Sequence, residues 1–311
     1  MPTQKPPFLS EPIENFPPKK ISAAVDFSEA STAALAAAKK IGRLCGARLD
    51  LVNINEPSPE SLLGDMYVAP GQDKDRQYYD GLRARLRALA EDYPQAGLRV
   101  EDGYAKSALA DLAESGDADL LVMGTRGRGG LERFFLGSTA EAVARVSRTP
   151  VLTVHRALAD DWPARVLAPM KLSSYADKSL LYALALAELL GARPTILYVA
   201  ENVAKEAASF KPVEEHLSRL LGRERCAGLG RIIAAGQVAD AILRAVERER
   251  YDLIVLSARR KPFWESFVLG TTAERVIRHS PVPVLSIPSL EPARRPLKEP
   301  ASEPSKAAWA D

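Results

Sequence analysis

The strongest constraint on the fold of this chain is that its two halves repeat one another. The segment FFLGSTAEAVARVSRTPVLTV, which starts at Phe134, matches FVLGTTAERVIRHSPVPVLSI, which starts at Phe267, without a gap. The separation is 133 residues, and a block further upstream has the same separation. At the start of each half, ISAAVDFSEAS from Ile21 answers to RVLAPMKLSSYA from Arg165. Internal similarity of this length indicates two copies of one domain and excludes a single large domain.

The repeat divides the chain of 311 residues into two domains with a terminal segment at each end. A chain of this length is comfortable for two domains. We expect the first domain over 19–157 and the second over 163–288. Residues 1–18 and 289–311 are rich in proline and charge. We therefore expect a flexible N-terminal arm and a disordered C-terminal tail.

Short apolar runs alternate with segments of helical spacing in each half. In the first half the expected strands are ISAAVD, RLDLVNI, LRVEDG, DLLVMG and PVLTVH. These runs are apolar on both faces, which is typical of a parallel sheet covered by helices on both sides. The first long helical segment stops at Gly46, as a helix with a C-terminal glycine does. The pattern predicts an α/β fold of two tandem, doubly wound, five-stranded parallel-sheet domains, each a Rossmann-like sandwich.

The stretch MGTRGRGGLERFFLGST, from Met123 to Thr139, follows the fourth expected strand. Ligands of doubly wound sheets bind beyond the carboxyl ends of the strands. Glycines there permit close backbone approach and positive φ, and the amino end of the next helix carries free N–H groups and partial positive charge. The stretch is thus suited to hold a phosphate. The alternative is a flexible loop with solvated arginines and an ordinary Ser or Thr N-cap.

The spacing of this stretch resembles a known signature. Gly124, Gly127 and Gly137-Ser138 form G-x2-G-x9-G-[S/T], which resembles the ATP-binding motif of the universal stress protein family. The opening AAVDFSEAS is similar to the first strand of that family, and RTPVLTVH is similar to its fifth. The resemblance covers nearly all of the chain outside the two terminal segments and implies a tandem, two-domain member.

The resemblance implies an adenine nucleotide, ATP, as the ligand of the first domain, with Mg²⁺ as a further candidate. Asp26 would accept hydrogen bonds from the ribose, and its alternative is an N-cap of the helix beginning near Ser28. Ile54 and Met123 would contact the base, and their alternative is plain core. The complete set of implied ligand residues is Ala24, Val25, Asp26, Ile54, Met123, Gly124, Arg126, Gly127, Gly137, Ser138 and Thr139.

The second copy departs from this signature. The replacements are Ser257 for Gly124, Arg260 for Gly127 and Lys171 for Asp26, while Gly270 and Thr271 persist. A lysine cannot accept a ribose hydrogen bond, and an arginine side chain obstructs backbone approach. We therefore expect that the second domain does not bind ATP in this way. Its basic loop, SARRKPFW, is either a site for a different anion or an exposed turn.

The family resemblance also implies how the domains pair. Family members pair through the strand nearest the C-terminus, here 149–154 and 282–287. Apolar edge strands left bare invite pairing, so we expect each to cover the other in an internal pseudo-dimer. A homodimer of the whole chain is a further expectation. The insertion Asn55–Gly81 is either a lid or dimer contact, or a surface loop.

The remaining observations bear on the class of function. A net charge of +2 gives no argument for nucleic-acid or membrane partners, and no run of 18 apolar residues is present. We expect a cytoplasmic protein. His155, His216 and His279 form no Ser-His-Asp order or metal cluster, and there is no P-loop. The pattern favours an ATP-binding stress-response protein that regulates an unknown protein partner. The alternatives are a nucleotide-using enzyme (an ATPase, or an adenylyl or phosphoryl transferase) and a nucleotide-free scaffold.

Overall fold

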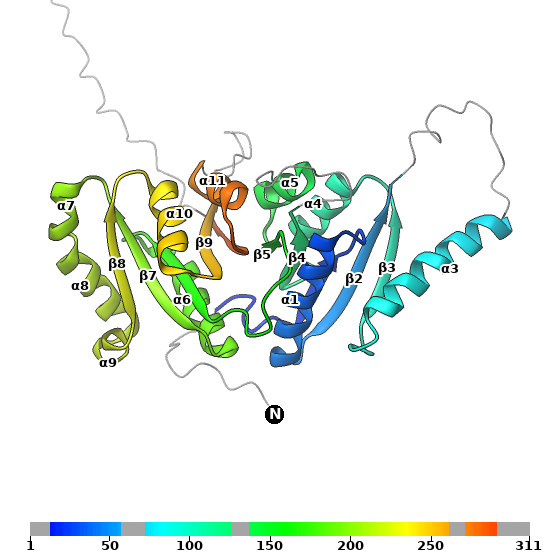
Figure 1. Cartoon of the computed structure of the whole chain (residues 1–311), viewed down its shortest axis with the longest axis horizontal. Helices are drawn as coiled ribbons and strands as arrows, with labels where there is room; N and C mark the ends of the chain where they lie inside the picture. The colour runs from blue at the N-terminus through cyan, green and yellow to red at the C-terminus, as the bar shows by residue number, and fades with distance from the viewer. Residues whose placement is uncertain (1–12, 57–71, 126–136, 261–270, 291–311) are drawn as a thin grey trace, which may run out of the picture.

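In the computed structural model, which describes residues 13–56, 72–125, 137–260 and 271–290, one continuous sheet runs through both halves of the chain (Figure 1). Its strand order is β3-β2-β1-β4-β5-β10-β9-β6-β7-β8. The strands of the first half are β1 (Lys20–Ala24), β2 (Arg48–Asn55), β3 (Gly97–Asp102), β4 (Leu120–Gly124) and β5 (Val151–Val154). Those of the second half are β6 (Arg165–Met170), β7 (Arg193–Ala200), β8 (Gly230–Ala235), β9 (Leu253–Arg260) and β10 (Val284–Leu290).

Helices cover both faces of this sheet. Those of the first half are α1 (Glu29–Cys45), α3 (Gln72–Leu89), α4 (Ala105–Ser115) and α5 (Ser138–Val146). Those of the second half are α6 (Ser174–Leu190), α7 (Val203–Ala208), α8 (Phe210–Leu221), α9 (Arg223–Ala227), α10 (Val238–Glu249) and α11 (Thr271–His279). Within each half every strand pairing is parallel, so the predicted doubly wound fold is confirmed.

The two halves join at an antiparallel seam between β5 and β10. Val284 pairs with Thr153, and Ser286 pairs with Val151. The buried hydroxyl of Thr153 donates to the carbonyl of Val284 at 3.1 Å, and that of Ser286 donates to the carbonyl of Val151 at 3.2 Å. Thr153 and Ser286 occupy the same position of the repeat. The seam is therefore pseudo-symmetric, and the predicted pairing of these two edge strands is confirmed.

Each face of the sheet carries a hydrophobic core that crosses the seam. One core contains apolar side chains of α1, α3, α6 and α8, and the other contains those of α4, α5, α10 and α11. The strands are apolar on both faces, so their side chains are buried against the helices on each side of the sheet. The second half thus completes the core of the first rather than standing beside it.

Residues 13–18, which the sequence placed in a flexible arm, are part of the packed structure. Ile13 is buried, and the ring of Phe16 makes an edge-to-face contact with Tyr182 of α6, with 5.0 Å between centroids. Glu14 forms an ion pair with Lys178 of α6. This segment therefore ties the start of the first half to a helix of the second. At the other end, β10 runs two residues past the expected boundary at 288.

The first long helix, α1, shows how the sequence sets local structure. Ser28 is its N-cap and accepts from the amide of Ser31, and Gly46 ends it with φ +65°. Gly191 ends α6 in the same way, with φ +67°. Such left-handed positions favour glycine, and the predicted stop at Gly46 is confirmed.

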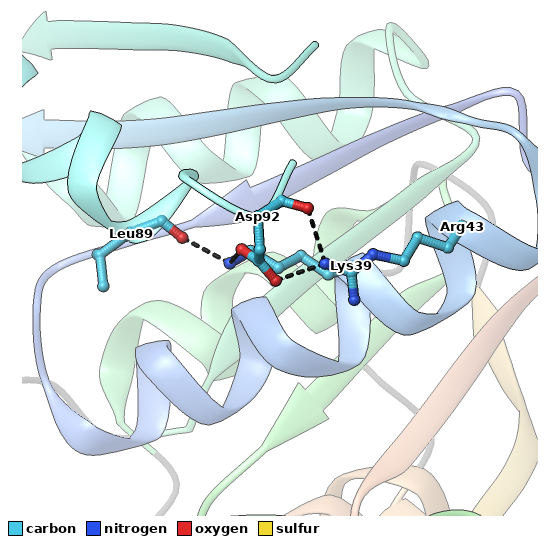
Figure 2. Close-up of polar contacts among 4 residues, drawn as sticks. All are labelled: Lys39, Arg43, Leu89 and Asp92. Carbon is cyan, nitrogen blue, oxygen red and sulfur yellow. Dashed lines mark hydrogen bonds and ion pairs between the residues drawn. The ribbon is translucent and has the colours of Figure 1, made fainter. Parts of the chain in front are cut away.

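A polar cluster fastens α1 to the turn after α3 (Figure 2). The carboxylate of Asp92 pairs with Lys39 and Arg43, which both project from α1. Lys39 also donates to the carbonyl of Leu89, the last residue of α3. Arg43 donates to the backbone carbonyl of Asp92 at 2.9 Å. One carboxylate thus connects two helices that cover the same face of the first half.

Candidate functional site

The candidate site lies where the strand order of the first half reverses. From β1 the chain adds β2 and β3 on one side and then β4 and β5 on the other. At such a switch point the loops beyond the carboxyl ends diverge and leave a crevice, which is where ligands of open α/β sheets bind. Strand pairing places the ends of β2 and β4 on either side of the end of β1, and Gly137 at the start of α5 bonds to Thr125 directly after β4.

The end of β1 is held by polar contacts. The amide of Val25 donates to Val52 at 2.8 Å, and its carbonyl accepts from the buried side-chain amide of Asn53 at 2.7 Å. Asp26 follows, and one of its carboxylate oxygens accepts from the amide of Ser28 at 2.9 Å and from the Ser28 hydroxyl at 2.6 Å. Ser28, rather than Asp26, is the N-cap of α1. Asp26 instead orients that capping hydroxyl.

The end of β4 lies directly against the amino end of α1. A Cβ added to Gly124 would lie 2.9 Å from the amide nitrogen of Ser31 and 3.0 Å from the carbonyl carbon of Ala30. Contacts this short with backbone atoms have no flexible side chain to relieve them. The predicted need for a glycine at this strand end therefore has a specific cause, the close approach of a helix amino terminus.

Gly137 makes a similar close approach at the start of α5. Its amide donates to the carbonyl of Thr125 at 2.8 Å, and a Cβ would lie 2.9 Å from that same oxygen. Thr125 is buried and its own amide donates to Val154 of β5 at 2.9 Å. The amino end of α5 is thereby fastened to the ends of β4 and β5.

Apolar side chains lie at the ends of β1, β2 and β4. Ala24 and Met123 are buried in the core on the α4 and α5 face of the sheet, and Ile54 packs against the same core half-buried. Val25, one residue on, belongs to the core of the opposite face. The alternation of a strand thus places Ala24, Ile54 and Met123 on a common side.

The first turn of α5 presents small residues at the crevice. Ser138 is exposed and Thr139 is half-buried, and they are the first two residues of the helix. The first amides of a helix have no acceptor within the helix, and its amino end carries partial positive charge. Arg126 and Gly127, the other two residues of the predicted phosphate loop, lie outside the residues that the structure describes.

Two residues that matter here were not predicted from the sequence. Thr125 connects the end of β4 to Gly137, and Asn53 holds the carbonyl of Val25. An asparagine inside an otherwise apolar strand was the available signal for Asn53, since a buried polar side chain requires a partner. The sequence gives no comparable signal for Thr125, because its hydrogen bond to Gly137 joins two residues that come together only in the folded chain.

The corresponding place in the second half is built differently. Here β9 continues through Arg260, the equivalent of Gly127, and pairs with β10 as far as Leu290. Ser257, at the position of Gly124, shares a hydrogen bond of 2.6 Å with the hydroxyl of Ser289. Lys171 follows β6 at the position of Asp26. β9 thus continues for three residues past Ser257, the position at which β4 ends in the first half.

Within the described residues, no helix is long and apolar enough to span a bilayer. In the same part of the chain, no three His, Cys, Asp or Glu side chains gather as a metal site would require. Both cysteines are free, and burial raises the pKa of the Cys45 thiol to about 12. A thiol with so high a pKa is a poor nucleophile at neutral pH.

Comparison with known proteins gives a consistent picture of both halves. The model of the universal stress protein family matches residues 18–155 and again 164–288. A universal stress protein of Thermus aquaticus is 34% identical over 136 residues, covering 44% of this chain and 98% of its own length. A universal stress protein solved in complex with cAMP is 29% identical and covers 44% of this chain and 97% of its own, with a TM-score of 0.32.

A solved structure also covers the tandem arrangement. The crystal structure of a universal stress protein from Archaeoglobus fulgidus superposes with a TM-score of 0.64 at 22% identity, covering 87% of this chain and 98% of its own. At that identity the likeness supports the fold. Because the family model matches both halves, this chain belongs to the universal stress protein family and carries two of its domains in tandem.

Proposed function

We propose that the first domain binds one adenine nucleotide, ATP, and that the second domain binds none. The observation that carries this proposal is the junction of β4 with α1 and α5. Gly124 and Gly137 there leave no room for a Cβ, and the amino end of α5 faces the switch point of the sheet. Backbone amides at a helix amino end are a ready site for phosphate.

The other half of the ligand has matching chemistry nearby. Asp26, at the end of β1, is a carboxylate that accepts hydrogen bonds, and ribose hydroxyls are donors. Ile54, half-buried at the end of β2, offers an apolar surface on which a planar base can lie, and it packs against the core that contains Ala24 and Met123. A nucleotide therefore satisfies both ends of the site, whereas inorganic phosphate would use only one. The amide of Val25 is bonded within the sheet and its carbonyl accepts from Asn53, so a base can use only the second lone pair of that carbonyl.

The second domain lacks the features that support binding in the first. Lys171 replaces the acceptor Asp26, and β9 continues as a paired strand through Arg260. We propose that this domain is a structural partner of the first, joined to it through β5 and β10. Occupancy of the first domain would then control how the whole molecule meets a protein partner in the stress response.

Calorimetric titration of ATP into the full chain tests the proposal. We expect one binding site per chain and no change after Thr272→Glu. Thr139→Glu, which places a carboxylate at the second position of α5, should weaken binding at least about tenfold through repulsion at close range. Glutamate is favourable in the first turn of a helix, so neither variant should unfold the protein.

Thr272 is the matched control because it is the second residue of α11, as Thr139 is of α5, and both are half-buried. Two sites per chain, or equal loss in the two variants, would show that the second domain also binds. Absence of heat with the wild-type chain, at a concentration of protein well above the expected Kd, would refute nucleotide binding and favour a nucleotide-free scaffold.

A further inference from the structure

A chain of alternating charges crosses the seam between the halves beside the candidate site. Glu141 lies in the first turn of α5, and its carboxylate accepts from Arg145 of the same helix at 2.7 Å. Arg278 of α11 also donates to Glu141, at 3.2 Å, and to Glu274 at 3.1 Å. Figure 1 shows α5 and α11 facing each other across the seam. Two arginines thus serve the single carboxylate of Glu141, and one of them comes from the second domain.

The position of Glu141 makes its charge relevant to the ligand. Its amide donates to the carbonyl of Gly137, so it lies one turn after the N-cap residue of α5. A negative charge in the first turn interacts favourably with the positive end of the helix. The same charge repels an anionic ligand at that end. Glu141 therefore opposes the binding of phosphate unless it is neutralised.

The surroundings of Glu141 are suited to such neutralisation. The side chains of Glu141, Arg278 and Glu274 are between 27% and 31% exposed. Charges that are partly withdrawn from water are screened less than charges on the open surface. Arg145 shares the helix with Glu141, whereas Arg278 is 137 residues away in the sequence. The contribution of Arg278 consequently exists only when the two domains are docked.

We propose that Arg278 of the second domain determines the nucleotide affinity of the first domain by neutralising Glu141. The inference rests on the proposed function and assigns to the second domain an electrostatic role in a site that it does not line. Arg278 acts through Glu141 and is a positioning residue, not a ligand of the phosphates. The binding site of the first domain is then electrostatically incomplete without the second.

Titrations of ATP into full-length variants at low salt test this role. Arg278→Gln should weaken binding about three- to tenfold, because the charge of Glu141 that it leaves less compensated acts on several phosphate charges. Glu141→Gln should tighten binding by a similar factor. The double variant should bind within about twofold of the wild type, since both charges are removed. Arg278→Lys, which keeps the charge, should restore most of the affinity.

Arg275→Gln is the matched control. Arg275 lies on the same helix and pairs with Asp240 of its own domain at 2.8 Å, so its loss should leave the affinity unchanged. Raising the salt concentration to about 0.5 M shortens the Debye length to a few ångströms and should reduce the effect of Arg278→Gln. A loss caused by misfolding would persist in high salt and would lower the melting temperature in parallel.

The outcomes separate the two proposals. Wild-type chain that binds ATP while Arg278→Gln behaves like Arg275→Gln would overturn the role of Arg278 and leave nucleotide binding intact. Weaker binding after Glu141→Gln would also overturn the role of Arg278. That result would show that ATP binding needs the carboxylate of Glu141, whereas the proposal predicts that loss of its negative charge favours binding. Failure of the wild-type chain to bind ATP would overturn both.

Discussion

At the scale of single residues, the candidate site depends on residues that have little or no side chain. Gly124 and Gly137 lie where a Cβ would meet backbone atoms. Asp26 already accepts a hydrogen bond from the hydroxyl of Ser28. Two glycines of the signature, Gly124 and Gly137, therefore have a packing reason. Gly124 lies where the end of β4 contacts the amino end of α1, and Gly137 lies where the start of α5 contacts Thr125.

Gly124→Ala should destabilise the chain, because the new Cβ collides with the backbone of Ala30 and Ser31 and forces a shift of α1. We expect a loss of about 1–3 kcal/mol in the free energy of unfolding, the usual cost of overpacking. Urea denaturation followed by circular dichroism measures it. The matched control is Gly81→Ala in α3, where a Cβ meets nothing within 4 Å. That change should stabilise by about 0.5–1 kcal/mol through helix propensity. Equal effects of the two changes would contradict the packing argument.

At the scale of elements, the helices on one face are connected by Asp92 (Figure 2). Hydrogen bonding from Lys39, joined by that from Arg43, lowers the pKa of the Asp92 carboxyl, and partial desolvation opposes this. Because the folded state has the lower pKa, the interaction stabilises the protein at pH values above the unfolded pKa. This stabilisation is lost as the pH falls through the folded pKa.

Asp92→Asn should therefore lower the free energy of unfolding at neutral pH and have a smaller effect near pH ~2. The Asp92 side chain is 57% exposed, so solvent screening limits the loss to about 0.5 kcal/mol. Denaturant titrations at the two pH values measure the difference. Asp80→Asn is the control, since the ion pair of Asp80 with Arg83 within α3 is long, at 3.5 Å. A loss of the same size at both pH values would show that the carboxylate charge is not responsible.

At the scale of the whole molecule, the two domains share one sheet and two cores. The β5–β10 seam buries the hydroxyls of Thr153 and Ser286 in reciprocal hydrogen bonds. Residues 13–18 cross to α6. Trp162, in the segment between the domains, is buried and donates to the carbonyl of Asp252 at 2.8 Å. Unfolding of either domain would therefore expose part of the hydrophobic core of the other.

The full chain should accordingly unfold in one calorimetric transition. Leu109→Ala in α4 and Ile242→Ala in α10 remove buried side chains from different domains, and each should cost about 2–5 kcal/mol. In a single cooperative unit, either change lowers the midpoint of the entire transition. Two separate transitions, with each variant shifting only its own, would show that the domains unfold independently.

Much of the fold could be predicted from local sequence. Short runs that are apolar on both faces indicated the strands, and the glycine at 46 indicated a helix end. Both signals are local, because hydrophobic patterns and left-handed helix caps act within a few residues. The repeat indicated two domains, and the family signature predicted a candidate site at the end of the fourth strand. The bounds of individual elements shifted by a few residues, since hydrogen bonding between neighbours decides where a strand stops.

The repeated α/β units and the position of the glycine-rich signature followed from the amino-acid sequence alone. The packing of residues 13–18 on α6, the pairing of β9 with β10 beyond Ser257, and the contact of Arg278 with Glu141 became apparent only in the folded chain. The difference lies in the range of the interactions. Periodicity and capping act within one element, whereas these contacts join residues far apart in the chain and exist only after the domains dock.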